Sequence, residues 1–427
     1  MTVTSPIDYA AVHQWLRAAA RPVLATDPRH SGTDLEALIE RLAAATVIGL
    51  GESTRFSRQT YGVRDRIFRT LVTKHGFRAL AIQDSVSSGE RLDAYVRTGL
   101  GDSRSVLAEA WRPWRTAEAV ATLDWIRAYN QARPDDPVRV LGIEPVSAQL
   151  DDYDVALDYV RRTAPERFAE LEAQLSVIRT AHRVDEHVQR HQGLHPGRPF
   201  ADHARDALTL LESLPHPTGL DAATAHDEAL VRIRRIVDFH ENSVAGLGGF
   251  GRDERRAAQI IIDRHNATGA RIVYWDGISH TAGLSLDIGG ETTERFIGEG
   301  SHLRTHFGSR YLSVAVGFHH GDLGVAAAPD PAPDLIDATL AAVDLPAFYV
   351  DLNSDAPAEV DRWRHGPVQA RVISGVYDPA RDAEARIRLS SLAGAFDVLI
   401  HVHETSPVRW LPEFDAPWPS HTDQPRP

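Results

Sequence analysis

The chain has 427 residues, of which 43% are hydrophobic and 25% charged, a composition typical of a globular protein with a sizeable core. Its formal net charge of −13 argues against nucleic acid as a main partner, because phosphate binding needs concentrated Lys and Arg. The sequence contains no cysteine, which excludes disulfides, thiolate metal sites and a cysteine nucleophile. It has no signal-like N-terminus and no 18-residue apolar run, so we expect a cytoplasmic protein that does not enter a membrane.

Two helical patterns lead into residues 45–58, the stretch around which the chain is organised. There an apolar run ends abruptly in Gly51-Glu52-Ser53-Thr54, and a third helical pattern covers 57–75. This order predicts a buried strand, a tight turn with Ser53 or Thr54 as helix N-cap, and Gly76 as C-cap. Ligands bind beyond the carboxyl ends of strands in open α/β sheets, so we expect Glu52 to lie in such a crevice.

Three later stretches repeat this design, each an apolar run that stops at polar residues. They end in Gln83-Asp84, in Glu144, and in Asp276 with His280 close behind. Their alternation with helical patterns predicts an α/β fold with a mostly parallel central sheet flanked by helices. The four strand ends are expected to form one polar pocket. The alternative is that these residues are helix caps and surface loops of an ordinary sheet.

Residues 147–268 contain no convincing strand and are predicted to form successive helices. Helical insertions between strands of one sheet often act as caps that shape ligand pockets. We therefore expect an α/β core of residues 1–146 and 269–411, with 147–268 as an all-helical insertion forming one wall of a deep cleft. His240 and Arg252 are its candidate substrate contacts. The Pro- and Asp-rich tail, 412–427, is expected to be disordered.

Three smaller patterns have both a functional and a structural interpretation. Trp114 and Arg115 follow a Trp-Arg-Pro segment and are candidates for a pocket wall, although such tryptophans are more often half-buried anchors. The arginines at 64–69 are predicted to lie on the solvated face of a helix. His401 and His403 share one face of the last strand. They have two possible roles, as a pair of metal ligands or as hydrogen-bond partners of neighbouring loops. We predict no metal and no cofactor, and the oligomeric state stays open.

Several separated stretches resemble the erythromycin esterase family, in matching order and spacing from about residue 45 to 411. Gly51 to Thr54 is similar to its GEATH turn, Gly76 to Ala79 to the start of its GFRAVALE strand, and Trp125 to Asn130 to its WLRAYN helix. Trp275 to His280 is similar to its WAHNAH strand end, Arg252-Asp253 to its RD-x-x-MA helix, and Tyr377 to Pro379 with 396–401 to its C-terminal signature.

The resemblance implies hydrolysis of a macrolide lactone by activated water, without a covalent enzyme intermediate, in a deep cleft lined by histidines and glutamates. Glu52 and His280 match family positions. Arg55 replaces the histidine after GEAT, Gln83 the glutamate after the second strand, and Gly277 the first histidine of WAHNAH. Arg does not accept a proton at pH 7 and Gln does not titrate, so groups that typically contribute about 10²- to 10⁴-fold in rate are absent.

Three hypotheses follow. The first is a metal-independent hydrolase of an ester or lactone of a natural product, such as an antibiotic of secondary metabolism. Glu52, Glu144 or His280 would then be the base, with Arg55, Gln83, Asp84 and Asp276 as substrate contacts. The second is a biosynthetic enzyme for cyclisation, elimination or acyl transfer on a polyketide-like or peptide intermediate, whose carboxylate Arg55 would bind. The third is a catalytically silent binding protein for a small molecule. The family resemblance favours the first.

Overall fold

The computed structural model describes residues 7–108, 110–144, 148, 150–179, 198–242, 253–288, 294–373 and 377–412. The chain divides into two compact units. The first, here called the sheet unit, comprises residues 1–84, 88–143 and 253–427, and the second, the helical unit, comprises 85–87 and 144–252. None of the helices in the described ranges combines the length and the apolar character needed to cross a bilayer.

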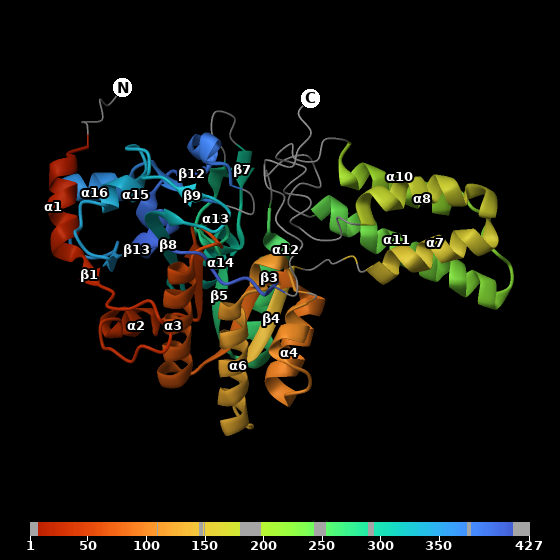
Figure 1. The fold of residues 1–427 in the computed structure, drawn as a ribbon, viewed down its shortest axis with the longest axis horizontal. Coiled ribbons are helices and arrows are strands. Elements are labelled where there is room, and N and C mark those ends of the chain that lie inside the picture. The colour runs from red at the N-terminus through yellow and green to blue at the C-terminus, as the bar shows by residue number, and fades with distance from the viewer. Residues whose placement is uncertain are drawn as a thin grey trace. The chain divides into compact units, whose positions relative to one another are not determined.

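The sheet unit is a mixed α/β structure built on a nine-stranded sheet (Figure 1). Five neighbouring strands run parallel in the spatial order β13-β8-β2-β5-β3, and β4 forms one edge beyond β3. The other edge and one side branch are antiparallel, made by β10 with β1 and by β9. This confirms the predicted fold class. The strands are β1 (Arg21–Pro22), β2 (Val47–Glu52), β3 (Phe77–Ser85), β4 (Arg139–Glu144), β5 (Arg271–Gly277), β8 (Tyr311–Asp322), β9 (Ala327–Ala328), β10 (Ala347–Asp351) and β13 (Val398–Thr405).

Both faces of the sheet are buried. Successive side chains of a strand point to opposite sides, and those on each side pack into a different core with helices. Leu50 and Trp275 belong to a core with apolar residues of the helices α2 (Glu36–Leu42), α3 (Arg58–His75), α4 (Val86–Thr98) and α6 (Ala117–Ala132). Val47 and Tyr274 belong to another core, with residues of α12 (Arg255–Thr268) and α14 (Glu299–Phe307). The short helix α5 (Ser103–Leu107) adds Leu107 to the first of these cores. A sheet covered on both faces leaves its strand ends as the place for polar chemistry.

Helix α3 occupies the predicted stretch, but its N-cap differs from the prediction. Its N-cap is Ser57, whose hydroxyl accepts a hydrogen bond from the Thr60 N–H at 3.1 Å, so the assignment to Ser53 or Thr54 is wrong. The residues between them form the turn that leaves β2. The predicted C-cap is confirmed, since Gly76 adopts the left-handed conformation with φ of 71°.

The arginines of α3 do not all face solvent. Arg64, Asp65 and Arg66 are buried, which corrects the prediction of a solvated face at 64–69. Asp65 accepts two hydrogen bonds from Arg69, at 2.9 and 2.6 Å. Arg66 forms an ion pair with Asp34. Pairing of each charge is what makes this burial tolerable.

A second, four-stranded antiparallel sheet in the order β11-β12-β6-β7 completes the sheet unit. Its strands are β6 (Leu286–Ile288), β7 (Glu294–Phe296), β11 (Val368–Arg371) and β12 (Arg386–Leu389). These strands span only three or four residues and carry almost no periodicity, so sequence patterns do not reveal them. Apolar residues of this sheet share a core with residues of the helices α1 (Tyr9–Ala19), α13 (Ile278–Thr281), α15 (Ile336–Leu340), α16 (Ala358–His365) and α17 (Leu392–Ala395).

The helical unit packs its helices around a core of its own. Two buried histidines are satisfied inside it: His240 pairs with the Tyr153 hydroxyl and His226 with that of Tyr159, each at 2.7 Å. Its boundary differs from the predicted 147–268, since α12 belongs to the sheet unit. Its helices are α7 (Leu150–Thr163), α8 (Phe168–Arg179), α10 (Phe200–Glu212) and α11 (Leu220–Asn242).

Candidate functional site

Glu52 ends the central strand β2 and is buried. Its Oε2 forms an ion pair with Nη2 of Arg64 from α3, and its Oε1 lies 3.6 Å from Nη1 of Arg55. Burial lowers the pKa of Arg64 to about 9, which still leaves the guanidinium charged at neutral pH. Both oxygens of Glu52 therefore face a cation.

Arg55 joins three strand ends. Its Nη2 donates hydrogen bonds to Oε1 of Gln83 at 2.5 Å and to Oδ1 of Asp276 at 3.3 Å. The guanidinium lies 4.1 Å from the centre of the Trp111 ring, a cation–π arrangement. Burial lowers the pKa of Arg55, and the charge of Asp276 opposes this shift. Nη1 is buried and has no hydrogen-bond acceptor among the described residues, so one donor is left for a ligand.

Asp276, at the end of β5, is fully buried. Its Oδ2 accepts from the Tyr274 hydroxyl and its Oδ1 from the Gly277 N–H, both at 2.6 Å. The helix α13 follows directly and carries His280. It packs closely on β2 because Gly51 has no side chain: a Cβ there would lie 2.9 Å from the Ile278 Cα. This close approach brings Nε2 of His280 to 3.8 Å from Oδ1 of Asp276.

Two glutamates surround the other nitrogen of His280. Nδ1 lies 2.7 Å from Oε2 of Glu254 and 3.6 Å from Oε2 of Glu299. Burial acts to lower the pKa of His280, but the charges of Asp276 and Glu254 outweigh it and hold the pKa well above its ordinary value. Burial, together with the charge of Glu254, raises the pKa of Glu299 well above its usual range.

The protonation states that follow balance the buried charges. Arg55, Arg64 and a protonated His280 supply three positive charges. Four carboxyl groups surround them, and the raised pKa of Glu299 makes it the carboxyl that most readily holds a proton. His280 is thus an imidazolium at neutral pH and becomes a proton acceptor only when the pH is raised.

The sequence and the fold can now be compared with known proteins. The family model described as erythromycin esterase matches residues 72–405. The chain belongs to the erythromycin esterase family. By the motif resemblance, Arg55 stands in place of the histidine after GEAT, and Asp276 stands where the WAHNAH strand end has alanine.

Three solved structures share the fold. A protein from Bacillus cereus is 20% identical with a TM-score of 0.62, covering 95% of this chain and 100% of its own. A succinoglycan biosynthesis protein is 19% identical with a TM-score of 0.61, covering 94% and 98%. A histidine-to-asparagine mutant of the erythromycin esterase EreC in its open conformation is 14% identical with a TM-score of 0.55, covering 90% and 96%. At these identities the likeness concerns the fold alone.

The loop around Trp111 is fixed to β3 by residues that the sequence assigned to substrate binding. Oδ2 of Asp84 accepts from the Trp111 N–H at 2.8 Å, and Nε1 of Trp114 donates to the Gln83 carbonyl at 2.9 Å. Arg115 is buried and donates twice to the Ala110 carbonyl, at 2.9 and 2.7 Å. These contacts hold Trp111 over Arg55. They give no support to substrate contacts by Trp114 and Arg115.

The remaining predicted residues lie elsewhere in the chain. Glu144 ends β4 and groups with the helical unit, and His240 lies in the interior of that unit, where it pairs with Tyr153. Arg252 falls outside the described residues. Their proposed roles beside Glu52 stay predictions. Glu52, Arg55, Gln83, Asp276 and His280 belong to one connected network of the sheet unit.

Sequence reasoning missed three members of this network: Arg64, Glu254 and Glu299. Glu254 follows the Arg252-Asp253 pair that carries part of the family resemblance, so a signal existed one residue away. Asp253 itself pairs with His302 at 2.6 Å. Glu299 opens a helix, where an acidic residue is usually explained by the helix dipole. Arg64 was missed because it lies among the arginines at 64–69, which the sequence analysis assigned to the solvated face of a helix.

Glu254, His280 and Glu299 could in principle hold a metal ion, since one ligand atom of each lies within 4.8 Å of the others. The 2.7 Å contact between Nδ1 of His280 and Glu254, with the raised pKa of His280, instead favours a proton at this position. A second group that meets the same criterion is His319, His320 and His403.

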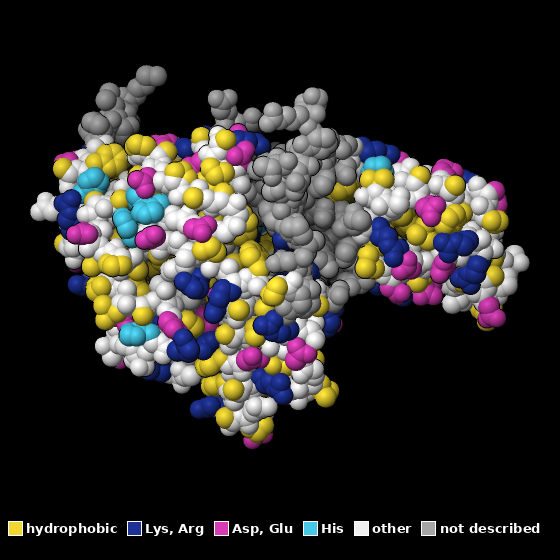
Figure 2. Space-filling view, viewed as in Figure 1, with side chains coloured by type: hydrophobic (Ala, Val, Ile, Leu, Met, Phe, Trp, Pro, Cys, Tyr) yellow, Lys and Arg dark blue, Asp and Glu magenta, His cyan; other side chains and the backbone are white. Residues whose placement is uncertain are grey.

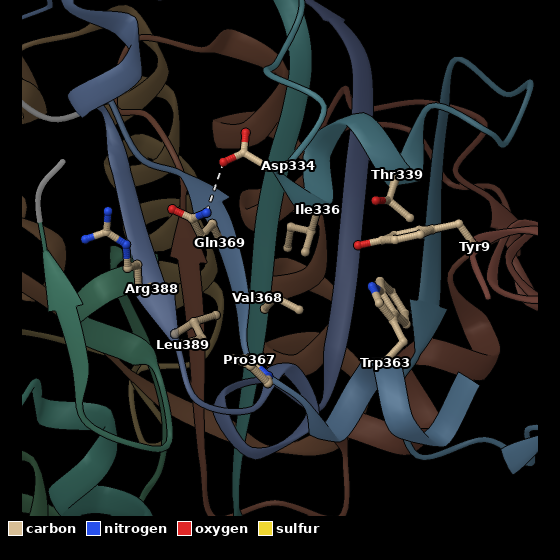
Figure 3. Close-up of a pocket in the computed structure, with 10 residues that line it drawn as sticks. All are labelled: Tyr9, Asp334, Ile336, Thr339, Trp363, Pro367, Val368, Gln369, Arg388 and Leu389. Atoms are coloured by element: carbon tan, nitrogen blue, oxygen red, sulfur yellow. Dashed lines mark hydrogen bonds between the residues drawn. The ribbon is translucent and has the colours of Figure 1, made fainter. Parts of the chain in front are cut away.

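The sheet unit also contains a pocket of about 270 Å³ that none of the predicted site residues lines. In Figure 3 the rings of Tyr9 and Trp363 face each other at one end, and Gln369 donates to Asp334 at the other, at 3.0 Å. The lining includes neither Glu52 nor His280, the two residues that match family positions. We therefore place the candidate active site at the network of Arg55 and His280. The pocket lining is Tyr9, Asp334, Ile336, Thr339, Trp363, Pro367, Val368, Gln369, Arg388 and Leu389.

Proposed function

We propose that this chain is an esterase-like hydrolase that cleaves an ester or lactone of a natural product, with catalytic residues altered from the family pattern. The observation that carries the proposal is the buried cluster of Asp276, His280, Glu254 and Glu299 beside Nη1 of Arg55, which has no hydrogen-bond acceptor among the described residues. Buried groups whose pKa values are strongly shifted, as those of His280 and Glu299 are, gather preferentially at active sites.

His280 is the base in this scheme, in its deprotonated form. Glu254 accepts a hydrogen bond from Nδ1–H, which leaves Nε2 to take a proton from water. The hydroxide adds to the carbonyl carbon, and Nη1 of Arg55 donates to the oxyanion. When the ester C–O bond breaks, the leaving oxygen takes the proton from Nε2–H. The products are one acid and one alcohol, and His280 returns to its starting state.

Glu52 acts through Arg55. Its ion pairs with Arg64 and Arg55 orient the guanidinium, so Glu52 is a positioning residue in this scheme. Glu52→Gln should abolish turnover by freeing Arg55. Because it also leaves Arg64 without its partner, the variant needs a thermal unfolding measurement beside its activity.

The test incubates the purified full chain with macrolide lactones and with aryl and alkyl esters, and records product mass. We expect a gain of one water in the wild type and a loss of roughly 10²- to 10⁴-fold in rate in His280→Asn. His306→Ala is the matched control, since His306 is exposed on α14, and it should keep full activity. The rate should rise with pH above neutrality, because the pKa of His280 is raised. Full activity in His280→Asn would remove this residue from the mechanism.

A second candidate function is non-hydrolytic chemistry on a substrate with a carboxylate. It is favoured by Arg55, a fixed cation with one free donor and an aromatic neighbour, in place of a family base. Cyclisation would conserve mass and elimination would lose a small group, so the same product analysis separates these outcomes. Arg55→His would then abolish turnover. In a hydrolase the same variant could restore hydrolysis of the family type, because it returns the family's histidine. Binding without turnover, unchanged in Glu52→Gln, would indicate a silent binder.

A further inference from the structure

Four histidines gather where two parallel strands lie side by side. His319 and His320 belong to the end of β8, and His401 and His403 to β13. The register of these strands pairs Val402 with Phe318 and Glu404 with His320, which puts the histidines next to one another. Figure 2 shows a histidine patch with acidic side chains beside it on the sheet unit. No step of the proposed hydrolysis uses these residues.

The ring nitrogens are spaced as metal ligands are. Nδ1 of His319 lies 2.8 Å from Nδ1 of His320, and Oδ1 of Asp330 lies 3.5 and 3.3 Å from these two atoms. Two ligands of a tetrahedral zinc ion, each at about 2.0–2.1 Å from the metal, are roughly 3.3 Å apart. The three atoms thus form a triangle close in size to one face of such a tetrahedron.

His403 supplies the fourth position. Its ring centre lies 5.0 Å from that of His319 and 5.2 Å from that of His320. One ligand atom from each of the three histidines lies within 4.8 Å of the others.

The surroundings fix the site but leave it open to an ion. Arg371, fully buried, donates to the backbone carbonyl of His319 at 2.8 Å and so holds the end of β8. His401, fully buried beneath His319, has no hydrogen-bond partner on either ring nitrogen among the described residues. The side chain of His320 is 33% exposed and that of Asp330 78%, so an ion can enter from solvent.

We propose that His319, His320 and His403, with Asp330 at the rim, bind a divalent transition metal ion, for which Zn²⁺ is the best fit. Three imidazoles and one carboxylate suit zinc and its neighbours, whereas Mg²⁺ and Ca²⁺ prefer sets of oxygens. This differs from the sequence-based expectation, which left His401 and His403 as a possible pair and predicted no metal. Their partners on β8 are distant in sequence and were not predicted to join them.

The experiment uses the full chain, stripped with a chelator and titrated with Zn²⁺ by calorimetry. We expect one ion per chain in the wild type, and affinity weakened by about 100-fold or more in His320→Ala and in His403→Ala. His365→Ala is the matched control, because His365 is also exposed and belongs to the same unit, and its affinity should equal that of the wild type. Mg²⁺ should not bind.

A second measurement separates loss of the site from loss of the fold. Zn²⁺ should raise the thermal unfolding temperature of the wild type but not that of the two variants, whose metal-free unfolding temperatures should match the wild type. Co²⁺ should give the visible absorption of a tetrahedral centre in the wild type alone. Absence of stoichiometric zinc in the wild type would overturn the proposal. Unchanged binding in His320→Ala and His403→Ala would also overturn it, since the ion would then bind other residues.

Discussion

One residue, Arg55, sets the chemistry of the candidate active site. The family has a histidine here, which can exchange a proton with water, whereas the guanidinium stays charged and needs counterions. Asp276, in place of a family alanine, supplies one of them at 3.3 Å, and Glu52 lies 3.6 Å away. The two departures from the family carry opposite charges, so each supplies the counterion that the other needs in order to be buried.

This complementarity predicts that Arg55 and Asp276 are energetically coupled. Arg55→Met leaves Asp276 as a buried charge without its cation and should lower the free energy of unfolding by about 3–5 kcal/mol. The double variant Arg55→Met/Asp276→Ala should lose less than the sum of the single variants, by roughly 1–3 kcal/mol. Urea unfolding of the four proteins measures this. Additive losses would show that the pair is not coupled.

The pKa of His280 should depend on Glu254 far more than on Glu299. Glu254→Gln removes a charge 2.7 Å from Nδ1, so the raised pKa should fall toward its ordinary value. Glu299→Gln is the matched control: burial and the charge of Glu254 raise the pKa of Glu299, so this carboxyl takes up a proton more readily than an ordinary glutamate and the substitution removes less charge. NMR titration of the histidine ring checks both variants. Equal shifts would contradict the assigned protonation of Glu299.

The sign of the stability effect follows from the raised pKa of His280. A histidine whose pKa is higher in the folded state contributes stability that is fully present below the unfolded pKa of 6.5. That contribution is lost as the pH rises through the folded value. Unfolding measured from pH 6 upward should therefore show a decline in the wild type that Glu254→Gln reduces.

At the level of elements, long periodic segments were predictable and short or charged ones were not. The central strands ending at Glu52, Asp276 and near Asp84 were found from apolar runs that stop at polar residues. The four-stranded sheet was largely missed because its strands have three or four residues. The burial of Arg64 was missed because its partner Glu52 lies on another element, and helical periodicity carries no information about such a partner.

The position of His280 depends on the close packing of α13 against Gly51 of β2. Gly51→Ala would place a Cβ 2.1 Å from Oγ1 of Thr281 and 2.9 Å from the Ile278 Cα, so α13 must move away from β2. We expect a loss of about 1–3 kcal/mol in stability and reduced turnover by the site. Gly219→Ala is the control, because a Cβ there meets no atom within 4 Å. Equal stability of the two variants would show that α13 accommodates the methyl group.

At the scale of the whole molecule, the site depends on strand order, which the sequence does not reveal. β5 lies between β2 and β3, so Asp276 comes next to Arg55 although more than two hundred residues separate them. The expectation of a common edge for these strand ends was sound because parallel strands end on the same side. Which residues pair there follows from the register of the sheet, and no local pattern encodes it.

The acidic residues behind the net charge of −13 include groups whose titration affects stability in opposite directions. Burial raises the pKa of Asp337 from 3.8 to about 6, although its Oδ2 accepts a hydrogen bond from the Arg371 N–H at 2.8 Å. An acid with a raised pKa contributes stability that is fully present below the unfolded value of 3.8 and is lost as the pH rises through about 6. The rise corresponds to roughly 3 kcal/mol.

Asp337→Asn should therefore flatten the pH dependence of unfolding between pH 4 and 6 by about 2–3 kcal/mol. The amide oxygen can accept the same hydrogen bond from Arg371, so the local structure should be kept. Urea unfolding at several pH values measures the difference. Asp27→Asn is the control of opposite sign, since hydrogen bonds from Arg29 lower the pKa of Asp27 to about 2, and its contribution is lost only as the pH falls toward that value. Parallel curves for the wild type and Asp337→Asn would show that Asp337 titrates alike in the folded and unfolded chain.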